Sequence, residues 1–244
     1  MKIAVIIPTY NERENIPILI NELKDVFKKN KINGNIIVVD DNSPDGTGKI
    51  VEDIQKKDSK INLVSREKRL GLGTAYIAGM KYAINNLNVD LIMTMDSDFS
   101  HNPNYIPSFI EKINQGFDMV LGSRYISGGG TYRWPLYRKV ISWGGNTLPR
   151  LVLGLKTHDN TTGFRCYKKE VLKKINLDAI KSNGYSFLVE MVFLCQRNNF
   201  KIGETPILFV DRKYGETKIS KKEILKTLNT LIKLKWNQIT KKEF

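Results

Sequence analysis

The feature of this sequence that most restricts its fold is a series of short apolar runs that alternate with longer amphipathic segments. The apolar runs, at residues 2–7, 35–39, 61–64, 91–95 and 119–122, have the length and the Ile and Val content of buried strands. Segments 15–30 and 71–86, and a segment that ends near residue 57, have the apolar spacing of helices. Strands that alternate with helices predict βαβ units and a mostly parallel sheet, so we expect an α/β fold.

Polar side chains directly follow three of these apolar runs. They are Asp40 with Asp41, Asp96 with Asp98, and Ser123 with Arg124. Open α/β sheets bind their ligands at the carboxyl ends of the strands. The sequence therefore predicts one site at which these polar residues meet.

Charge is concentrated at the C-terminal end of the chain. The net charge of +14 over 244 residues favours anionic partners such as nucleotides or acidic lipids. Residues 211–244 carry ten Lys and Arg against four Asp and Glu, so much of the excess is local. Residues 222–236 have helical spacing, with an expected apolar face made of Ile224, Leu225, Leu228, Leu231 and Ile232.

No segment of the sequence predicts a membrane span or a secretory signal. The first nine residues lack the basic start and the cleavage site of a signal peptide, and no stretch reaches about 18 apolar residues. Cys166 and Cys195 lie in apolar surroundings that suit buried free thiols. We therefore expect a cytoplasmic protein that reaches a membrane only peripherally, at its cytosolic face, or through a small membrane-spanning subunit.

Asp96-Ser97-Asp98 is the strongest local signal. Two carboxylates at the end of a strand can share a divalent cation that also holds two phosphates, and Mg²⁺ or Mn²⁺ suits such oxygen ligands. Taken alone, the same triplet is more often a solvated loop after a strand. The neighbouring strand ends favour the metal-binding interpretation.

Two other strand ends carry a functional and a structural interpretation. In segment 40–46 a carboxylate can accept hydrogen bonds from a ribose or a base, but Pro44-Asp45-Gly46 is also a good turn. In segment 8–12 Tyr10 can stack on a base, whereas Thr9 or Asn11 could simply cap the following helix.

Six ordered segments together resemble the family 2 glycosyltransferases and, within that family, the dolichyl-phosphate mannose synthases. The segments are 7–12 (IPTYNE), 39–47 (VDDNSPDGT), 96–101 (DSDFSH), 122–125 (GSRY), 162–165 (TGFR) and 209–218 (FVDRKYGETK). The similarity spans about residues 3 to 220. Two departures are Asn42, where a small residue is usual, and Ser100, where many relatives have Gln near the metal.

The resemblance implies a GT-A fold over residues 1–220. The basic amphipathic helix expected at 221–244 either contacts a membrane or a partner or packs against the catalytic domain. It implies inverting transfer of mannose from GDP-mannose to dolichyl or another polyprenyl phosphate. The implied nucleotide-sugar contacts are Pro8, Tyr10, Glu12, Val39, Asp41, Asp96, Ser97, Arg124, Arg212 and Lys218. The implied ligands of Mg²⁺ or Mn²⁺ are Asp96 and Asp98, with Ser100 as a further candidate that reaches the ion through water.

The expected chemistry needs no general base. A phosphate monoester with a second pKa of about 6 is largely dianionic at neutral pH, so the acceptor can attack the anomeric carbon directly. Asp98, Arg124, Arg212 and Lys218 are then the expected catalytic residues, because catalysis reduces to positioning and charge. The alternative for the three cationic residues is ordinary surface basicity.

The roles of Glu190, His101 and two segments of the chain stay open at this point. Glu190 lies in an apolar run and either helps to bind the acceptor or forms an ion pair with an Arg such as Arg165. His101 is expected to cap or pack near the metal loop. Residues 202–210 predict a last strand, and residues 128–155 have no mechanistic interpretation beyond acceptor or membrane contacts.

Two rival functions remain. The first is a related family 2 enzyme that uses UDP-glucose or another donor, or a saccharide acceptor, although segment 212–218 favours a lipid phosphate. The second is a basic nucleic-acid-binding protein, which the net charge of +14 permits. Acidic residues at the strand ends would repel a phosphate backbone unless a metal is present, so we expect no nucleic-acid partner.

Overall fold

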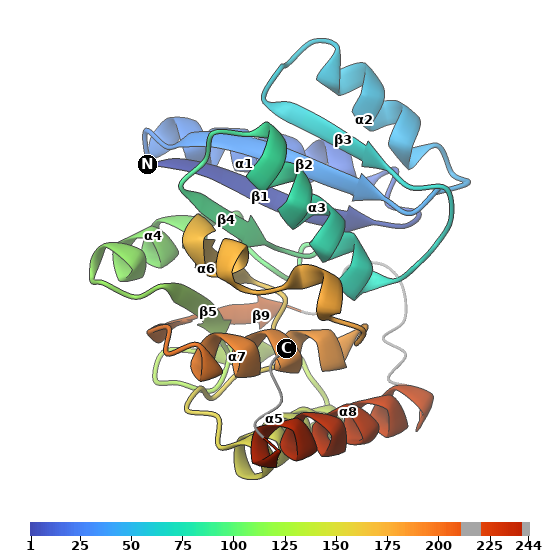
Figure 1. Ribbon diagram of the computed structural model, residues 1–244. Coiled ribbons are helices and arrows are strands. Elements are labelled where there is room, and N and C mark those ends of the chain that lie inside the picture. Colours follow the sequence, from blue (N-terminus) through green and yellow to red (C-terminus); the bar gives the residue numbers. More distant parts are fainter. Residues whose placement is uncertain (211–220, 241–244) are drawn as a thin grey trace.

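The strands form one large sheet in the computed structural model, which describes residues 1–210 and 221–240 (Figure 1). The sheet has seven strands in the order β3-β2-β1-β4-β7-β5-β8. They are β1 (Lys2–Thr9), β2 (Asn33–Asp40), β3 (Ile61–Ser65), β4 (Leu91–Thr94), β5 (Met119–Ser123), β7 (Arg165–Lys168) and β8 (Ile202–Pro206). The first five are the strands that the apolar runs predict.

Helices cover both faces of this sheet (Figure 1). They are α1 (Asn15–Lys29), α2 (Thr47–Gln55), α3 (Leu72–Asn86), α4 (Ile106–Asn114), α5 (Leu136–Leu153), α6 (Lys169–Lys174), α7 (Tyr185–Arg197) and α8 (Lys221–Ile239), with single turns η1 (Pro103–Tyr105) and η2 (Leu177–Ala179). The core on one face includes residues of α3, α6 and α7, and the core on the other includes residues of α1, α2 and α4. The predicted α/β architecture is confirmed.

Strand β1 shows why the sheet must be covered twice. Its odd residues Ile3, Val5 and Ile7 are buried in one core, and its even residues Ala4 and Ile6 are buried in the other. Side chains of a strand alternate between the two faces, so an uninterrupted apolar run gives a strand that both faces must bury.

Strand direction brings the polar strand ends together. β1, β2, β3 and β4 run parallel to one another, and β7 runs antiparallel between β4 and β5. The carboxyl ends of β1, β2, β4 and β5 therefore lie at the same edge of the sheet. The segment that leads into β7, residues 157–164, reaches that edge too, because β7 starts where its neighbours end.

The predicted strand 202–210 is wrong as a single element. It forms β8 and then β9 (Leu208–Val210), which pairs with β6 (Gly130–Tyr132) in a separate two-stranded sheet. Ile207 lies between them: its N–H donates to Ser123 of the large sheet, and its carbonyl accepts from Gly130. The chain thus passes from one sheet to the other at a single residue, which an apolar pattern does not reveal.

Helix α8 packs against α7 and α5. Among the α8 side chains that the structure describes, from residue 226 on, Leu231 (2% exposed) and Leu234 (1%) are buried, whereas Ile232 is 69% exposed. The helix therefore packs against the catalytic domain with part of its predicted apolar face and leaves Ile232 of that face exposed. The predicted boundary at residue 220, and the side chains of Ile224 and Leu225, lie outside the described part of the chain.

The two cysteines are buried free thiols, as predicted. Cys166 lies in β7 and Cys195 in α7, and burial raises the pKa of both, that of Cys195 to about 12. Among the described residues, no helix combines the length and the apolar content that crossing a bilayer requires.

Gly79 allows α3 to approach the sheet closely, which gives a first prediction. A Cβ atom at this position would lie 2.4 Å from Ile6 Cγ2 and 3.1 Å from Val39 Cγ2. We expect Gly79→Ala to lower the free energy of unfolding by about 1–3 kcal/mol, measured by urea denaturation, because a packed core resists added volume. Gly145→Ala is the control, since a Cβ there meets no atom within 4 Å. Equal effects of the two substitutions would contradict the prediction.

Candidate active site

A cavity of about 280 Å³ opens at the carboxyl edge of the sheet. Asp96, Asp98, His101 and Arg124 line its polar end. The rest of its wall comes mainly from α5, α7 and α8, including Ile141, Leu148, Val189, Leu228 and Leu231. The cavity is therefore polar where the strands end and apolar where the helices meet.

The two carboxylates of the predicted metal site are held by neighbouring hydroxyl groups. Asp96 Oδ1 accepts a hydrogen bond of 2.8 Å from the phenol of Tyr76, and Asp98 Oδ1 accepts from Ser100 Oγ at 2.6 Å and from Ser100 N–H at 3.1 Å. Burial and the neighbouring Asp96 raise the pKa of Tyr76, so this phenol stays protonated and donates. The hydroxyl of Ser100 thus orients Asp98, and its contact with an ion stays a prediction.

His101 packs beneath the loop that carries Asp96 and Asp98 and hydrogen-bonds to its backbone. Its Nδ1 accepts a hydrogen bond of 3.0 Å from the Asp96 backbone N–H, and its ring stacks on Phe164. Burial lowers the pKa of His101, although Asp96 and Asp98 oppose this shift, and the neutral ring is the form that can accept at Nδ1. The predicted packing role of His101 is confirmed.

The donor set fits a hard cation that is shared with substrate. Within the described residues no group of three or more His, Cys, Asp and Glu side chains is placed to hold a metal ion. Asp96 and Asp98 alone supply two carboxylates. Mg²⁺ commonly binds proteins through one or two carboxylates and takes its other ligands from phosphates and water, so this pair suits Mg²⁺ or Mn²⁺.

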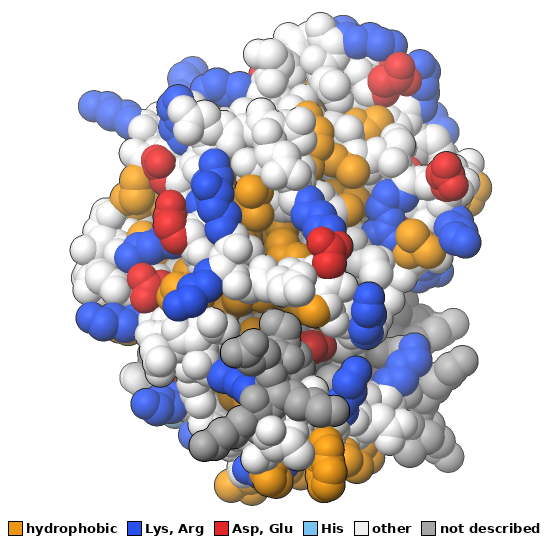
Figure 2. Space-filling model, in the orientation of Figure 1, with side chains coloured by type: hydrophobic (Ala, Val, Ile, Leu, Met, Phe, Trp, Pro, Cys, Tyr) orange, Lys and Arg blue, Asp and Glu red, His pale blue; other side chains and the backbone are white. Residues whose placement is uncertain are grey.

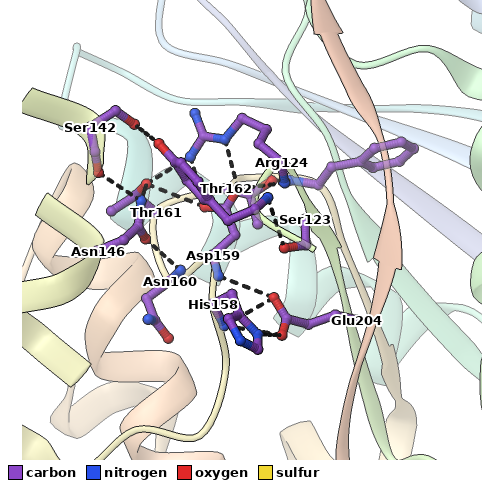
Figure 3. A network of polar contacts seen from close by, with 12 residues as sticks. Ser123, Arg124, Ser142, Asn146, His158, Asp159, Asn160, Thr161, Thr162 and Glu204 are labelled. Atoms are coloured by element: carbon purple, nitrogen blue, oxygen red, sulfur yellow. Dashed lines mark hydrogen bonds and ion pairs between the residues drawn. The ribbon is translucent and has the colours of Figure 1, made fainter. Parts of the chain in front are cut away.

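Arg124 forms a buried ion pair with Asp159 beside these carboxylates (Figure 3). Arg124 Nε and Nη2 donate to the two oxygens of Asp159 at 2.6 and 2.7 Å, and Nη2 also donates to Thr161 Oγ1 at 2.8 Å. Asp159 is completely buried and Arg124 is 9% exposed. A paired arginine with a fixed plane at the cavity wall is well suited to hold a phosphate.

Electrostatics keep both members of this pair ionised. Burial alone would lower the pKa of Arg124, but the adjacent Asp159 carboxylate raises it above its ordinary value. Burial alone would raise the pKa of Asp159, but the charge and hydrogen bonds of Arg124 hold it below its ordinary value. The pair therefore stays charged at neutral pH.

Asp159 is held from the side opposite Arg124. Its backbone N–H donates to Glu204 at 3.1 Å, and the N–H and ring of His158 also contact Glu204 (Figure 3). Sequence reasoning missed Asp159. It lies three residues before the Thr162-Gly163-Phe164-Arg165 segment, and an acid beside that segment was the available signal.

Glu190 and Arg165 do not form the ion pair that was one of the predicted alternatives. The Arg165 guanidinium donates to three backbone carbonyls, those of Asn160, Thr162 and Leu188. Glu190 accepts a hydrogen bond from Ser182 Oγ, and burial raises its pKa. Arg165 thus fixes the segment that carries Asp159, which a sequence pattern does not indicate.

The predicted nucleotide-binding residues gather at the ends of β1 and β2. Asp41 Oδ2 accepts from the N–H groups of Leu70 and Gly71 at 3.1 and 3.2 Å, and Arg66 Nε lies 3.0 Å from Asp41 Oδ1. The side chain of Arg69 lies 4.1 Å over the ring of Tyr10. Segment 66–71 therefore contacts Asp41 and Tyr10, two of the residues predicted to bind the nucleotide.

The other predicted nucleotide contacts differ in accessibility. Pro8 and Glu12 are partly exposed, and Ser97 is buried. Val39 is completely buried in the core, so only its backbone could contact a nucleotide. Arg212 and Lys218, predicted to bind phosphate, lie outside the described residues.

For segments 8–12 and 40–46 the sequence also allowed purely structural roles, a helix cap in the first and a turn in the second. The structure excludes the cap and shows the turn. Thr9 and Asn11 do not cap α1, because Thr9 Oγ1 donates to Asp40 and the Asn11 N–H donates to Ser43. The turn at Asp45 is confirmed, since its carboxylate accepts from Thr47 N–H, Thr47 Oγ1 and Arg13 N–H. Asp45 thus orders the start of α2.

Residues 128–155, which carried no clear prediction, form β6 and α5 and supply one wall of the cavity. Trp134 lies between two arginines, with the Arg138 guanidinium 4.0 Å and that of Arg124 5.5 Å from its ring centroid. This segment thus encloses the polar end of the cavity in aromatic surface.

Comparisons with known proteins identify relatives over most of the chain. Residues 4–176 match the family model described as Glycosyl transferase family 2. The chain is 41% identical over 220 residues to undecaprenyl-phosphate mannosyltransferase of Micrococcus luteus, which covers 90% of this chain and 88% of that protein. It is 38% identical over 217 residues to polyprenol monophosphomannose synthase of Mycolicibacterium smegmatis, covering 88% and 80% respectively.

Solved structures confirm the predicted GT-A fold. Glucosyl-3-phosphoglycerate synthase from Mycobacterium tuberculosis, solved with Mn²⁺, UDP and phosphoglyceric acid, aligns with a TM-score of 0.65. The alignment covers 96% of this chain and 78% of that one, at 18% sequence identity. At this identity the likeness concerns the fold alone.

The buried ion pair gives a second prediction. We expect Asp159→Asn to lower the free energy of unfolding by about 3–5 kcal/mol in urea denaturation, because it leaves the Arg124 charge buried without its partner. Asp118→Asn is the matched control, since Asp118 pairs with Lys168 at 2.9 Å in a partly exposed position. That substitution should cost about 1 kcal/mol or less. A loss for Asp159→Asn no larger than the control would contradict the structural role of the pair.

Proposed function

The chain belongs to glycosyl transferase family 2, and we propose that it transfers mannose from GDP-mannose to the phosphate of a polyprenyl phosphate. The observation that carries this proposal is the two-ended cavity, whose carboxylates and arginine suit phosphates and whose helical end is apolar. A lipid phosphate has the same two parts. The relatives named undecaprenyl-phosphate mannosyltransferase and polyprenol monophosphomannose synthase support the choice of sugar and acceptor.

The polar end of the cavity suits the phosphates of both substrates. Asp96 and Asp98 would hold Mg²⁺ or Mn²⁺, which supplies positive charge to the departing nucleoside diphosphate. Arg124, oriented by Asp159, points its charge at the same region and offsets repulsion between two anions. Arg212 and Lys218 are proposed as further phosphate ligands on the strength of the family resemblance.

The reaction balances without a catalytic base. An oxygen of the acceptor phosphate attacks the anomeric carbon, and the bond from that carbon to the β-phosphate oxygen breaks. The products are polyprenyl-phosphate mannose and GDP, with inversion at the anomeric carbon. The protein's part is to hold the two phosphates in line and to exclude water with the apolar walls of the cavity.

The donor base would lie near the ends of β1 and β2. Tyr10 offers a ring for stacking, and Asp41 offers a carboxylate for ribose or base hydroxyl and N–H groups. Tyr10 follows β1, which pairs with β4, and Asp41 follows β2, which pairs with β1. Asp96 lies two residues after the end of β4 at Thr94, so one nucleoside diphosphate can reach from this pocket to Asp96 and Asp98.

Helices α5 and α8 form a surface that suits a bilayer. They lie together at one end of the molecule (Figure 1), and the same end shows gathered apolar side chains with Lys and Arg beside them (Figure 2). Of the eighteen large apolar side chains exposed in the described residues, seven lie on α5 and four on α8. They are Leu136, Tyr137, Val140, Ile141, Trp143, Leu148, Leu151, Leu228, Ile232, Trp236 and Ile239.

Charge on these helices favours an anionic membrane. Arg138, Lys139 and Arg150 lie on α5 and Lys226, Lys233 and Lys235 on α8, and neither α5 nor residues 226–239 contain Asp or Glu. An apolar face flanked by basic side chains is typical of helices that lie in a membrane interface. We therefore propose peripheral attachment through α5 and α8, at the cytosolic face where the two free thiols would stay reduced.

Transfer of labelled sugar tests the proposed reaction. The purified protein is incubated with GDP-mannose or UDP-glucose, a polyprenyl phosphate in detergent, and Mg²⁺ or Mn²⁺. We expect a mannolipid that disappears with EDTA, and Asp98→Asn should lower its rate of formation by at least about 100-fold, because the metal ion that would offset the negative charge of the leaving group is no longer held. Asp53→Asn, an exposed acid on α2, is the control. Formation of glucolipid alone would show that the proposed donor is wrong. Absence of any lipid product would show that the proposed acceptor is wrong.

Co-sedimentation with vesicles tests the membrane surface. We expect Trp143→Glu with Trp236→Glu to weaken binding to vesicles that contain phosphatidylglycerol by about tenfold or more, because each Trp that enters the bilayer contributes about 1.5 kcal/mol or more. Ile18→Glu, which alters an exposed apolar residue of α1 away from this surface, is the control. Unchanged binding of the double variant would exclude the α5 and α8 surface.

A further inference from the structure

The segment from Arg66 to Gly71, called here the strap, contacts both side chains proposed to hold the nucleoside. Its first residue pairs with Asp41 at 3.0 Å, and the N–H groups of its last two residues donate to the same carboxylate. Arg69 of the strap stacks on Tyr10. A displacement of the strap would therefore move the groups around Asp41 and Tyr10 together.

Asn183 holds the strap from the other half of the chain. Its Nδ2 donates to the Leu70 carbonyl at 2.8 Å, and its Oδ1 accepts from the Gly73 N–H at 2.8 Å. Gly73 lies in the first turn of α3, and the residue before that helix, Gly71, provides no side-chain cap. Asn183 therefore caps α3 from a segment that is 110 residues away, and it fixes the strap with the same amide group.

The end of the strap and the start of α3 lie so close to the segment around Asn183 that two positions there, Gly71 and Gly73, have no room for a side chain. A Cβ atom at Gly71 would lie 2.4 Å from Asn183 Nδ2, and one at Gly73 would lie 2.9 Å from Phe187 Cβ. Gly71 also has a φ of +95°, a conformation that other residues rarely adopt. The contact between Asn183 and the strap is thus close-packed as well as hydrogen-bonded.

Asn183 is itself fixed beside the cavity that is proposed to take the acceptor, called here the acceptor cavity. Its Oδ1 accepts from the Gly184 N–H at 2.8 Å, and its carbonyl accepts from Ser186 Oγ at 2.7 Å. The next residue but one, Tyr185, starts α7 and lines the cavity together with Val189. Asn183 therefore connects the wall of the acceptor cavity with the strap on the donor side.

We propose that Asn183 is a positioning residue for the nucleoside diphosphate: it holds the strap so that Asp41 and Tyr10 face the nucleoside. The inference rests on the proposed function only in taking a nucleoside diphosphate as the ligand. An amide is required because one end must donate and the other accept. A carboxylate would place an oxygen against the Leu70 carbonyl, and alanine would remove both hydrogen bonds.

Calorimetric titration with GDP, and separately with UDP, in the presence of Mg²⁺ tests this proposal on the full chain. We expect Asn183→Asp to raise the Kd of whichever nucleotide binds the unaltered protein by roughly three- to tenfold, as the loss of one hydrogen bond implies, and Asn183→Ala, which loses both, to raise it at least as much. Asn198→Ala is the control. Asn198 lies at the other end of α7 and donates only within its own turn, to the Leu194 carbonyl.

Steady-state kinetics separate positioning from a general loss of structure. Under the proposal the KM for the donor rises by the same factor as the Kd, while the KM for the polyprenyl phosphate and the kcat at saturating donor stay unchanged. Asn183→Asp is nearly isosteric, so it carries the test if the alanine variant does not fold. Nucleotide affinity equal to that of the unaltered protein in both variants, or a rise in the acceptor KM alone, would overturn the proposal.

The outcomes also distinguish this proposal from the proposed function. If the unaltered protein binds GDP but makes no mannolipid, and Asn183→Ala binds GDP more weakly, the role of Asn183 stands and the acceptor or sugar is wrong. If mannolipid forms and Asn183→Ala binds GDP normally, the function stands and the role of Asn183 is wrong.

Discussion

The buried ion pair between Arg124 and Asp159 joins the parts of the chain that make the site. Arg124 follows β5, and Asp159 lies in the segment that leads into antiparallel β7. A buried arginine without a partner would be strongly destabilising, so the segment 157–164 must lie where its carboxylate can reach. The same segment carries Gly163, whose carbonyl accepts from Thr94 at the end of β4. This ion pair and the Thr94 hydrogen bond thus fix the polar end of the cavity against β5 and β4, the two strands on either side of β7.

The cavity suits a substrate with two unlike ends because two kinds of structure meet in it. Strand ends supply carboxylates and an arginine. Hydrogen bonds and the rigid sheet hold these charged groups in place. Helices α5 and α8 supply apolar side chains, and they leave further apolar side chains exposed on their outer faces. An apolar wall that continues onto an apolar and basic surface gives a lipid tail a path out of the site without passing through water.

The donor side depends on short contacts over long sequence distances. Asp41 is bound by the strap, the strap is bound by Asn183, and Asn183 lies two residues before α7, whose side chains line the cavity. These hydrogen bonds join two partly exposed segments near the edge of the sheet at which the strands end. The arrangement places donor and acceptor regions on the same rigid elements, as in-line transfer between two phosphates requires.

The sequence by itself determined the α/β class, the first five strands and the grouping of Asp41, Asp96 and Arg124 at one edge. Apolar runs that end in polar residues encode these features locally, since strand direction follows from βαβ units. The family resemblance added the residues expected to contact the nucleotide sugar, and the family model and the named relatives confirm the family. Only the tertiary structure decided that Asp159 pairs with Arg124, that Arg165 binds carbonyls and that Asn183 holds the strap. Asp159 lies 35 residues from Arg124, Leu188 lies 23 residues from Arg165, and Asn183 lies 113 residues from Leu70, and no periodic pattern specifies such pairs. The fate of α8 was decided in the same way, because the surfaces of α5 and α7 select which of its apolar residues are buried.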